Sequence, residues 1–145
     1  MCREVLDAVV RRLTEMFPEE DGYVIFTNTV ETQFLNPVFL VGFNQISEKS
    51  YPGGRYLRSN GMHIRYFPGK KTQPNGEIEQ VSEMLLKGLE YVTLEEGSLL
   101  RGTDRVIKIE DGILDFKVNY NMFLYRQKET EQTMESVNVE KGLVK

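Results

Sequence analysis

The chain has 145 residues, of which 40% are hydrophobic, so it is long enough for one domain with a core and too short to argue for two. Its 22 acidic and 18 basic residues give a net charge of -4, which disfavours a large surface for binding nucleic acid or anionic lipid. The one cysteine, Cys2, excludes an internal disulfide and a zinc site built from cysteines, and it fits a reducing cytoplasm. No apolar run approaches the ~20 residues of a membrane span and no export signal is visible, so we expect neither a membrane anchor nor export.

The N-terminal part is predicted to form a helix followed by a strand. From Arg3 to Phe17, apolar residues recur with the spacing of one helical face, and charged residues fall largely on the other. Pro18 and the acidic turn after it end the helix, because proline cannot donate a backbone hydrogen bond. A strand is predicted from Tyr23 to about Phe34, since aromatic and β-branched residues open it and its composition stays compatible with a strand.

Three strand segments are predicted next. The run from Val38 to Phe43 is too apolar for a solvent-facing edge, so we place it centrally in the sheet. The segment from Ser50 to Gly54 has the proline and glycines of a hairpin turn, which leads back into Arg55 to Arg58. From Gly61 to Pro68 the side chains alternate between two faces as in a half-buried strand, and the short connection implies antiparallel pairing.

The second half is predicted to contain a loop, a helix and a long hairpin. The segment from Gly69 to Gly76 has no apolar residue and is predicted to be an exposed loop, which makes it a candidate functional surface. A helix is predicted from Glu77 to Tyr91, where apolar residues again follow helical periodicity. The turn from Glu110 to Gly112 joins two long strands. At about 3.4 Å per residue the last strand, from Ile113 to Arg126, would reach roughly 45 Å, so part of the hairpin is expected to project or to be covered by another subunit.

These elements predict a single α+β domain with a mostly antiparallel sheet, two helices packed on one face, and the order α-β-β-β-α-β-β. We expect the domain to span residues 1–126 and the polar residues 127–145 to form a flexible tail. The expected core combines apolar positions of both helices with inward positions of the strands: Val9, Leu13, Val81, Leu85, Leu89, Val41, Ile64, Phe116 and Val118.

No residue pattern indicates a catalytic, cofactor-binding or metal site. His63 has no second histidine with which to complete a metal site or a nucleophilic pair. Cys2 lacks a histidine at any motif-like spacing, and the glycines match neither a P-loop nor a dinucleotide-binding fingerprint. We therefore expect that the protein is not an enzyme and needs no cofactor.

Aromatic residues beside arginines raise a nucleic-acid alternative. This combination, which proteins use to stack single-stranded bases, is formed here by the rings of Tyr56, Tyr66 and Phe67 beside Arg55, Arg58 and Arg65. Because the chain is acidic and has no RNP-like motif, packing in the core and in an interface is the favoured use of these rings.

A family resemblance rests on the succession of four stretches, none of which is a catalytic motif. They are Phe34–Phe39 after a Val-Glu-Thr-Gln step, Gly54–Arg58, His63–Pro68 and Asp111–Asn121. In this succession the chain resembles the tail-terminator-like proteins, small phage and prophage proteins from the tail gene clusters of phages of Gram-positive bacteria. The resemblance covers nearly the whole chain up to Arg126.

The resemblance implies a structural protein that forms a ring, typically hexameric, caps the tail tube and contributes to head-tail joining. The implied partners are further copies of the chain, the tail tube protein and a head-tail connector protein, with DNA only as passing cargo and no membrane. The implied location is the host cytoplasm during assembly and the tail of the virion afterwards.

Two alternatives stay open at this point. A head-side connector or completion protein would also be a ring-forming structural component of similar size. A nucleic-acid-binding module would require a basic stripe that only folding creates.

For the ring, contacts with subunits or with the tube are expected at strand ends and in the exposed loop, at Tyr51, Arg55, Arg58, Lys70 and Lys71.

Overall fold

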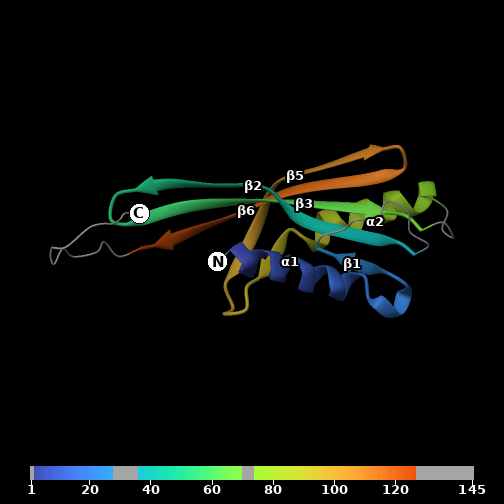
Figure 1. Ribbon diagram of the computed structural model, residues 1–145, viewed down its shortest axis with the longest axis horizontal. Coiled ribbons are helices and arrows are strands. Elements are labelled where there is room, and N and C mark those ends of the chain that lie inside the picture. The colour runs from blue at the N-terminus through green and yellow to red at the C-terminus, as the bar shows by residue number, and fades with distance from the viewer. Residues whose placement is uncertain (1, 28–35, 70–73, 127–145) are drawn as a thin grey trace.

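The computed structural model describes residues 2–27, 36–69 and 74–126 and shows one α+β domain in which two helices lie against a six-stranded sheet (Figure 1). The predicted tail 127–145, the loop residues Lys70 and Lys71, and the end of the strand predicted to reach Phe34 lie outside the described residues. The elements in chain order are α1 (Cys2–Met16), the 3-10 helix η1 (Glu19–Asp21), β1 (Val24–Phe26), β2 (Val38–Tyr51), β3 (Arg55–Phe67), α2 (Pro74–Gly88), β4 (Tyr91–Thr93), β5 (Leu99–Glu110) and β6 (Ile113–Tyr125).

The sheet has the strand order β1-β2-β3-β6-β5-β4 and is antiparallel except for the parallel pair of β1 and β2. The structure adds a short strand, β4, to the predicted order, and it joins the two predicted strand segments of residues 55–68 into one strand, β3. The prediction that Val38 to Phe43 lies centrally is wrong, because β3 and β6 are the central strands. The apolar run lies in β2, which has β1 beside it only from Val38 to Leu40.

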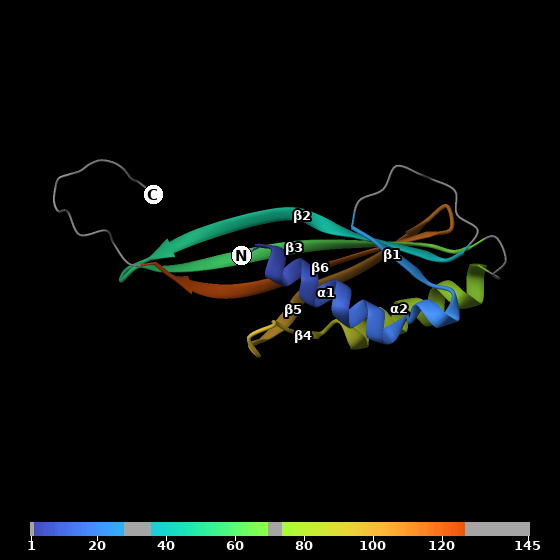
Figure 2. The ribbon, with the colours of Figure 1, turned by 60° about the horizontal axis from the view of Figure 1, so that its bottom comes forward.

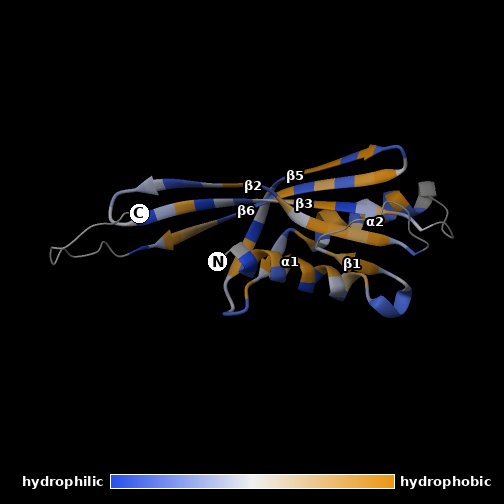
Figure 3. Cartoon of the chain, in the orientation of Figure 1, coloured by the Kyte–Doolittle hydropathy of each residue, from blue (hydrophilic) through white to orange (hydrophobic). Residues whose placement is uncertain are grey.

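Both helices pack on one face of the sheet, which we call the covered face (Figure 2). All nine core residues predicted from the sequence are buried, and Leu85 is 0% exposed. Alternation explains this, since Phe116 and Ile64 face each other across β6 and β3 and both point toward the helices. Polar groups tie the helices to each other and to the sheet: Arg12 Nε donates to Gly88 O of α2 at 2.9 Å, and Arg11 Nη2 donates to Thr93 O of β4 at 2.7 Å. Figure 3 shows the resulting alternation of hydrophobic and hydrophilic residues along the strands.

Two β-bulges lie at the same level of the sheet. In β2, Asn44 is an extra residue between the partners of Met62 and Gly61, and in β5 the register shifts between Thr103 and Val106. Glycine is favoured at Gly61, because a Cβ there would lie 3.0 Å from the backbone oxygen of Gln45 and would displace the side chain of Asn44, whose Oδ1 would be 2.4 Å away. Bulges bend strands and increase their twist, so this level is where the sheet changes direction.

Beyond the bulges three strands continue past the helices and form a projecting arm (Figures 1 and 2). The arm consists of Gln45–Tyr51 of β2, Arg55–Gly61 of β3 and Asn119–Tyr125 of β6. Gly53 and Gly54 close its tip with φ values of 85° and 75°, which glycine adopts without strain. The sequence predicted that part of the β5–β6 hairpin would project or be covered by another subunit. The part that projects is the second half of β6, which joins the β2–β3 hairpin in the arm, because β5 pairs with β6 only as far as Tyr120.

Candidate functional site

One face of the arm carries aromatic and cationic side chains. It continues the face of the sheet that the helices leave bare, which we call the open face. On it Arg55 lies over two rings, with its guanidinium carbon 5.4 Å from the centroid of Tyr51 and 5.2 Å from that of Phe123. The two rings are 6.1 Å apart, and Lys49 Nζ lies 5.7 Å from the Tyr51 centroid. Such cation-π and ring contacts hold long side chains in fixed positions on a surface that no helix covers.

The other face of the arm carries an ionic network. Glu48 Oε2 accepts hydrogen bonds from Arg58 Nε and from Arg126 Nη2, each at 2.8 Å. These hydrogen bonds, Arg126 first and Arg58 second, lower the pKa of Glu48 below its ordinary value. The guanidinium of Arg126 also lies 4.4 Å from the ring centroid of Tyr56, and its backbone N–H donates to Gly54 O at 2.9 Å. The network therefore connects all three strands at the tip of the arm.

The residues predicted to form the interface are separated by the fold. Tyr51 and Arg55 lie together on the open face at the tip of the arm. Arg58 lies at the same end but on the opposite face, bonded to Glu48. Lys70 and Lys71 lie outside the described residues, and Phe67, the end of β3 nearest to them in sequence, is at the other end of that strand from Arg55.

Sequence reasoning missed the aromatic residues that β6 adds to the arm. Phe123 and Tyr125 are 49% and 74% exposed. The sequence did contain an indication of this surface. Asn119 and Asn121 make that face of the strand polar, and the two aromatic residues that follow on the same face interrupt the pattern. A solvated face gains nothing from large apolar side chains, so the interruption indicates a contact surface.

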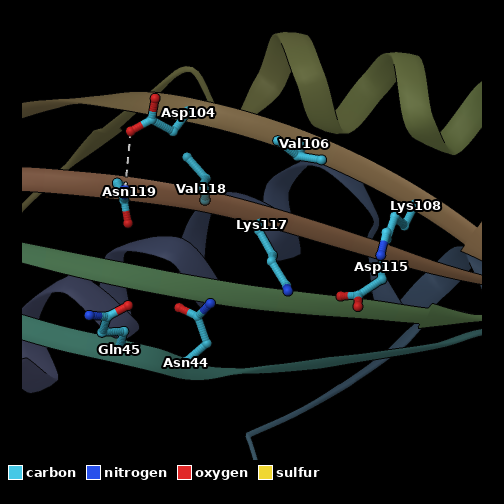
Figure 4. Close-up of a pocket in the computed structure, with 9 residues that line it drawn as sticks. All are labelled: Asn44, Gln45, Asp104, Val106, Lys108, Asp115, Lys117, Val118 and Asn119. Atoms are coloured by element: carbon cyan, nitrogen blue, oxygen red, sulfur yellow. Dashed lines mark hydrogen bonds between the residues drawn. The ribbon is translucent and has the colours of Figure 1, made fainter.

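Outside the arm, a polar cluster on the open face includes the single histidine. His63 Nε2 lies 2.5 Å from Asp115 Oδ1, although the contact is not aligned as a hydrogen bond and neither atom has another partner. Asp115 also lines a shallow pocket together with Lys108, Lys117 and the bulge residue Asn44 (Figure 4). Within the described parts of the chain, no three histidine, cysteine, aspartate or glutamate side chains gather in a way that could hold a metal ion. None of the described helices is long and apolar enough to cross a membrane.

Comparison with known proteins connects this architecture to a family. The family model described as "Phage tail terminator protein" matches residues 4–132, a range that begins within α1 and includes every later element as far as β6. A comparison with curated proteins gave no match. The family match spans most of the chain and confirms the resemblance found in the sequence. The chain belongs to the phage tail terminator family and is a structural component of the phage tail.

Proposed function

We propose that the chain closes into a ring, most simply of six subunits, which caps the end of the tail tube and offers a surface for joining the head. It performs this role as a structural protein without catalysis. The observation that carries the proposal is the projecting arm, which within the described residues has unpaired strand edges and exposes the aromatic side chains of Phe123 and Tyr125. Family membership directs these contacts toward other components of the tail.

The unpaired edges support contact between subunits. In the described residues, no strand pairs with the outer edge of β2 beyond Leu40, or with the outer edge of β6 beyond Tyr120. Soluble monomers usually cover or blunt such edges, since a row of free N–H and C=O groups is a template for pairing. A contact between two different surfaces that repeats with a closing rotation produces a ring.

The side chains of the arm support the same use. Aromatic residues and arginine are enriched at the centres of protein interfaces, where a few of them contribute most of the binding energy. Tyr51, Arg55 and Phe123 form such a group, and their mutual contacts position them before a partner arrives. A group that is ordered in advance loses less conformational entropy on binding.

The lumen of the ring would let DNA pass as cargo. The family match favours a tail position over a head-side completion protein, because the description of the family names the tail.

The polar clusters in the described residues are structural pairings, such as the Glu48 network, and none combines a nucleophile with a base.

The test is light scattering of the purified chain over a concentration series, with and without assembled tail tubes, followed by electron microscopy of tube ends. Rings are expected at high concentration or on tube ends. The double variant Phe123→Ser and Tyr125→Ser is expected to lose them. The matched control is Ile109→Ser, which removes a side chain of similar exposure, 51%, from β5 outside the arm and should leave rings intact.

Two results would remove the proposal. One is a chain that stays monomeric at all concentrations and leaves tube ends bare. The other is a phage that lacks the gene, is supplied with this chain, and still produces tails of unregulated length.

A further inference from the structure

The charges of the protein are segregated between its two layers. The segments that carry the helices and their connections, residues 2–27 and 74–98, contain twelve acidic and four basic side chains. The strand segments 36–69 and 99–126 contain nine basic side chains and five acidic ones. The helical layer is therefore strongly acidic although the net charge of the whole chain is only -4, and the sheet is basic.

The basic side chains of the sheet concentrate on its open face. Around the carboxylate of Asp115, Arg65 and Lys108 are its direct neighbours across β3 and β5, and Lys117 follows two residues later on the same face. Three permanent cations thus surround one carboxylate, which already lies against His63. Arg65, Lys108 and Lys117 are all exposed, and no ion pair with a carboxylate is found for them within the described residues.

The basic region is continuous with the arm. Alternation along β3 places Arg55 on the same face as Arg65, and alternation along β6 places Phe123 on the same face as Lys117. Figure 4 shows Lys117 extending from β6 across the neighbouring strand toward Asn44, and Lys108 beside the carboxylate of Asp115. The open face is thus one surface, with cations, amides and the carboxylates of Asp104 and Asp115 over the body of the sheet, and cations and rings over the arm.

The helical layer has the opposite character. Glu79 and Glu83 are exposed one turn apart on α2, and residues 19–21 of η1 add three exposed carboxylates. The basic residues of α1 are occupied internally: Arg11 and Arg12 bond backbone oxygens, and Arg3 lies 3.5 Å from Asp7. The carboxylates of α2 and η1 therefore dominate the surface of this layer.

We infer that the basic open face of one copy docks on the acidic helical layer of a second copy, and that this contact repeats around the ring. The inference rests on the proposed function, because it names the surfaces that join the subunits. The second copy is favoured over DNA as the occupant, since the acidic helical layer repels a polyanion and attracts a basic face. The two surfaces lie on opposite layers of one subunit, which is the arrangement that a head-to-tail contact requires.

Reversing charges on one face at a time tests the contact. The first variant, Lys108→Glu with Lys117→Glu, makes the open face acidic, and the second, Glu79→Lys with Glu83→Lys, makes α2 basic. Each variant alone is expected to associate at least about tenfold more weakly than the parent in sedimentation velocity, because like charges then face each other. An equimolar mixture of the two is expected to recover assembly, since every contact between unlike variants is again complementary and an even-membered ring can alternate them.

Controls separate this contact from net charge and from misfolding. Arg3→Glu with Lys87→Glu lowers the net charge as much as the first variant does, but on the helical layer, so its association should be at least as tight as that of the parent. If Lys108→Glu with Lys117→Glu does not fold, Lys108→Gln with Lys117→Gln keeps polar, neutral side chains and still removes the attraction. Raising the salt to about 1 M, where the Debye length is about 3 Å, should weaken the parent contact and leave the neutral variant less affected.

The outcomes distinguish this inference from the function it rests on. If the parent forms rings and both reversed variants form them equally well, the docking surfaces are wrong and the ring stands. If single variants fail and the mixture does not recover, the cations serve another partner. Binding of a fluorescently labelled short DNA duplex, measured by anisotropy, would then identify nucleic acid as that partner. The binding should depend on salt and be lost only in the variants changed at Lys108 and Lys117. A parent that never forms rings, with or without tubes, overturns both proposals.

Discussion

The same three strands are stabilised in different ways on the two sides of the bulges. Under the helices, β2, β3 and β6 are held by burial, and Ile64 and Phe116 are 0% exposed. At the base of the arm Tyr120 is still buried and donates to Leu89 O. Beyond it no helix lies over the strands, and pairs across strands hold them: Glu48 with Arg58 on one face, Arg55 with Phe123 on the other. The strand pattern is continuous across both regions, so alternation of side chains specifies a strand without specifying what covers it.

The difference gives each region its own sensitivity to substitution. Burial contributes roughly 25 cal/mol for each Å² of apolar surface removed from water, whereas exposed ion pairs and ring contacts each contribute little. The helix-covered body should therefore determine whether the chain folds, and the arm should determine what the folded chain binds.

The largest expected effect is on the helix-covered side. Leu85→Ala should lower the free energy of unfolding by about 2 to 5 kcal/mol, because it leaves a cavity between α2 and the sheet. Urea denaturation measures the change. Met84→Ala, one residue away but 38% exposed, is the control and should change the free energy of unfolding far less. Equal losses in the two variants would mean that the packing face of α2 is misassigned.

The next effect lies at the boundary between the regions. Gly61→Ala should cost about 1 to 3 kcal/mol, because its Cβ would meet Asn44 Oδ1 at 2.4 Å and the backbone oxygen of Gln45 at 3.0 Å. Gly42→Ala in the neighbouring strand meets nothing within 4 Å and should be neutral or slightly stabilising. Thermal unfolding of both variants makes the comparison. A neutral result for Gly61→Ala would show that the bulge at Asn44 is not fixed by this contact.

The sequence predicted the covered side better than the arm for a physical reason. Phe116 and Val118 could be assigned to the core because burial imposes a period of two on a strand and 3.6 on a helix. The position of the apolar run from Val38 to Phe43 was mispredicted because apolar residues in a strand indicate that the strand is buried, not where it lies in the order of the sheet. Here a helix buries one face of β2, although β2 is not a central strand.

The excess length of the last strand indicated from the sequence that something projects, but the sequence did not show which strands form the arm. Which strand continues beside β6 depends on two bulges, and an extra residue such as Asn44 leaves no mark in the sequence because strands have no fixed length. Tyr51 and Arg55 were found because they adjoin a turn signal, whereas Phe123 required knowing that β6 ends beside that turn. Arg58 follows Arg55 by three residues on the same predicted strand, so alternation alone would have placed the two arginines on opposite faces.

A smaller effect is expected from the open face of the arm. Phe123→Ala should lower the free energy of unfolding by only about 0.5 to 1.5 kcal/mol, the range of ring contacts, because half of the side chain is already in solvent. Its effect on association should be larger than its effect on stability, in contrast to Leu85→Ala. Urea denaturation and light scattering on the same samples give both values. A variant that unfolds as easily as Leu85→Ala would place the arm in the same cooperative core as the body.

The smallest effect concerns the ionic face of the arm and its dependence on pH. Hydrogen bonds from Arg126 and Arg58 lower the pKa of Glu48, so the folded arm binds fewer protons than the unfolded chain does. The stabilisation is therefore fully present above the ordinary pKa of 4.5 and is lost as the pH falls through the lowered value. Exposed ion pairs contribute little, so the loss should appear as local fraying at the tip while the body stays folded.

Amide hydrogen exchange at Arg126, whose N–H donates to Gly54 O, should become faster relative to the intrinsic exchange rate as the pH drops in the parent. Glu48→Gln should show that fast exchange at every pH, whereas Asp7→Asn, which removes an exposed carboxylate on α1, should leave exchange at the tip unchanged. A protected Arg126 amide in Glu48→Gln would show that backbone pairing alone holds the tip, and that the two faces of the arm differ less than their side chains indicate.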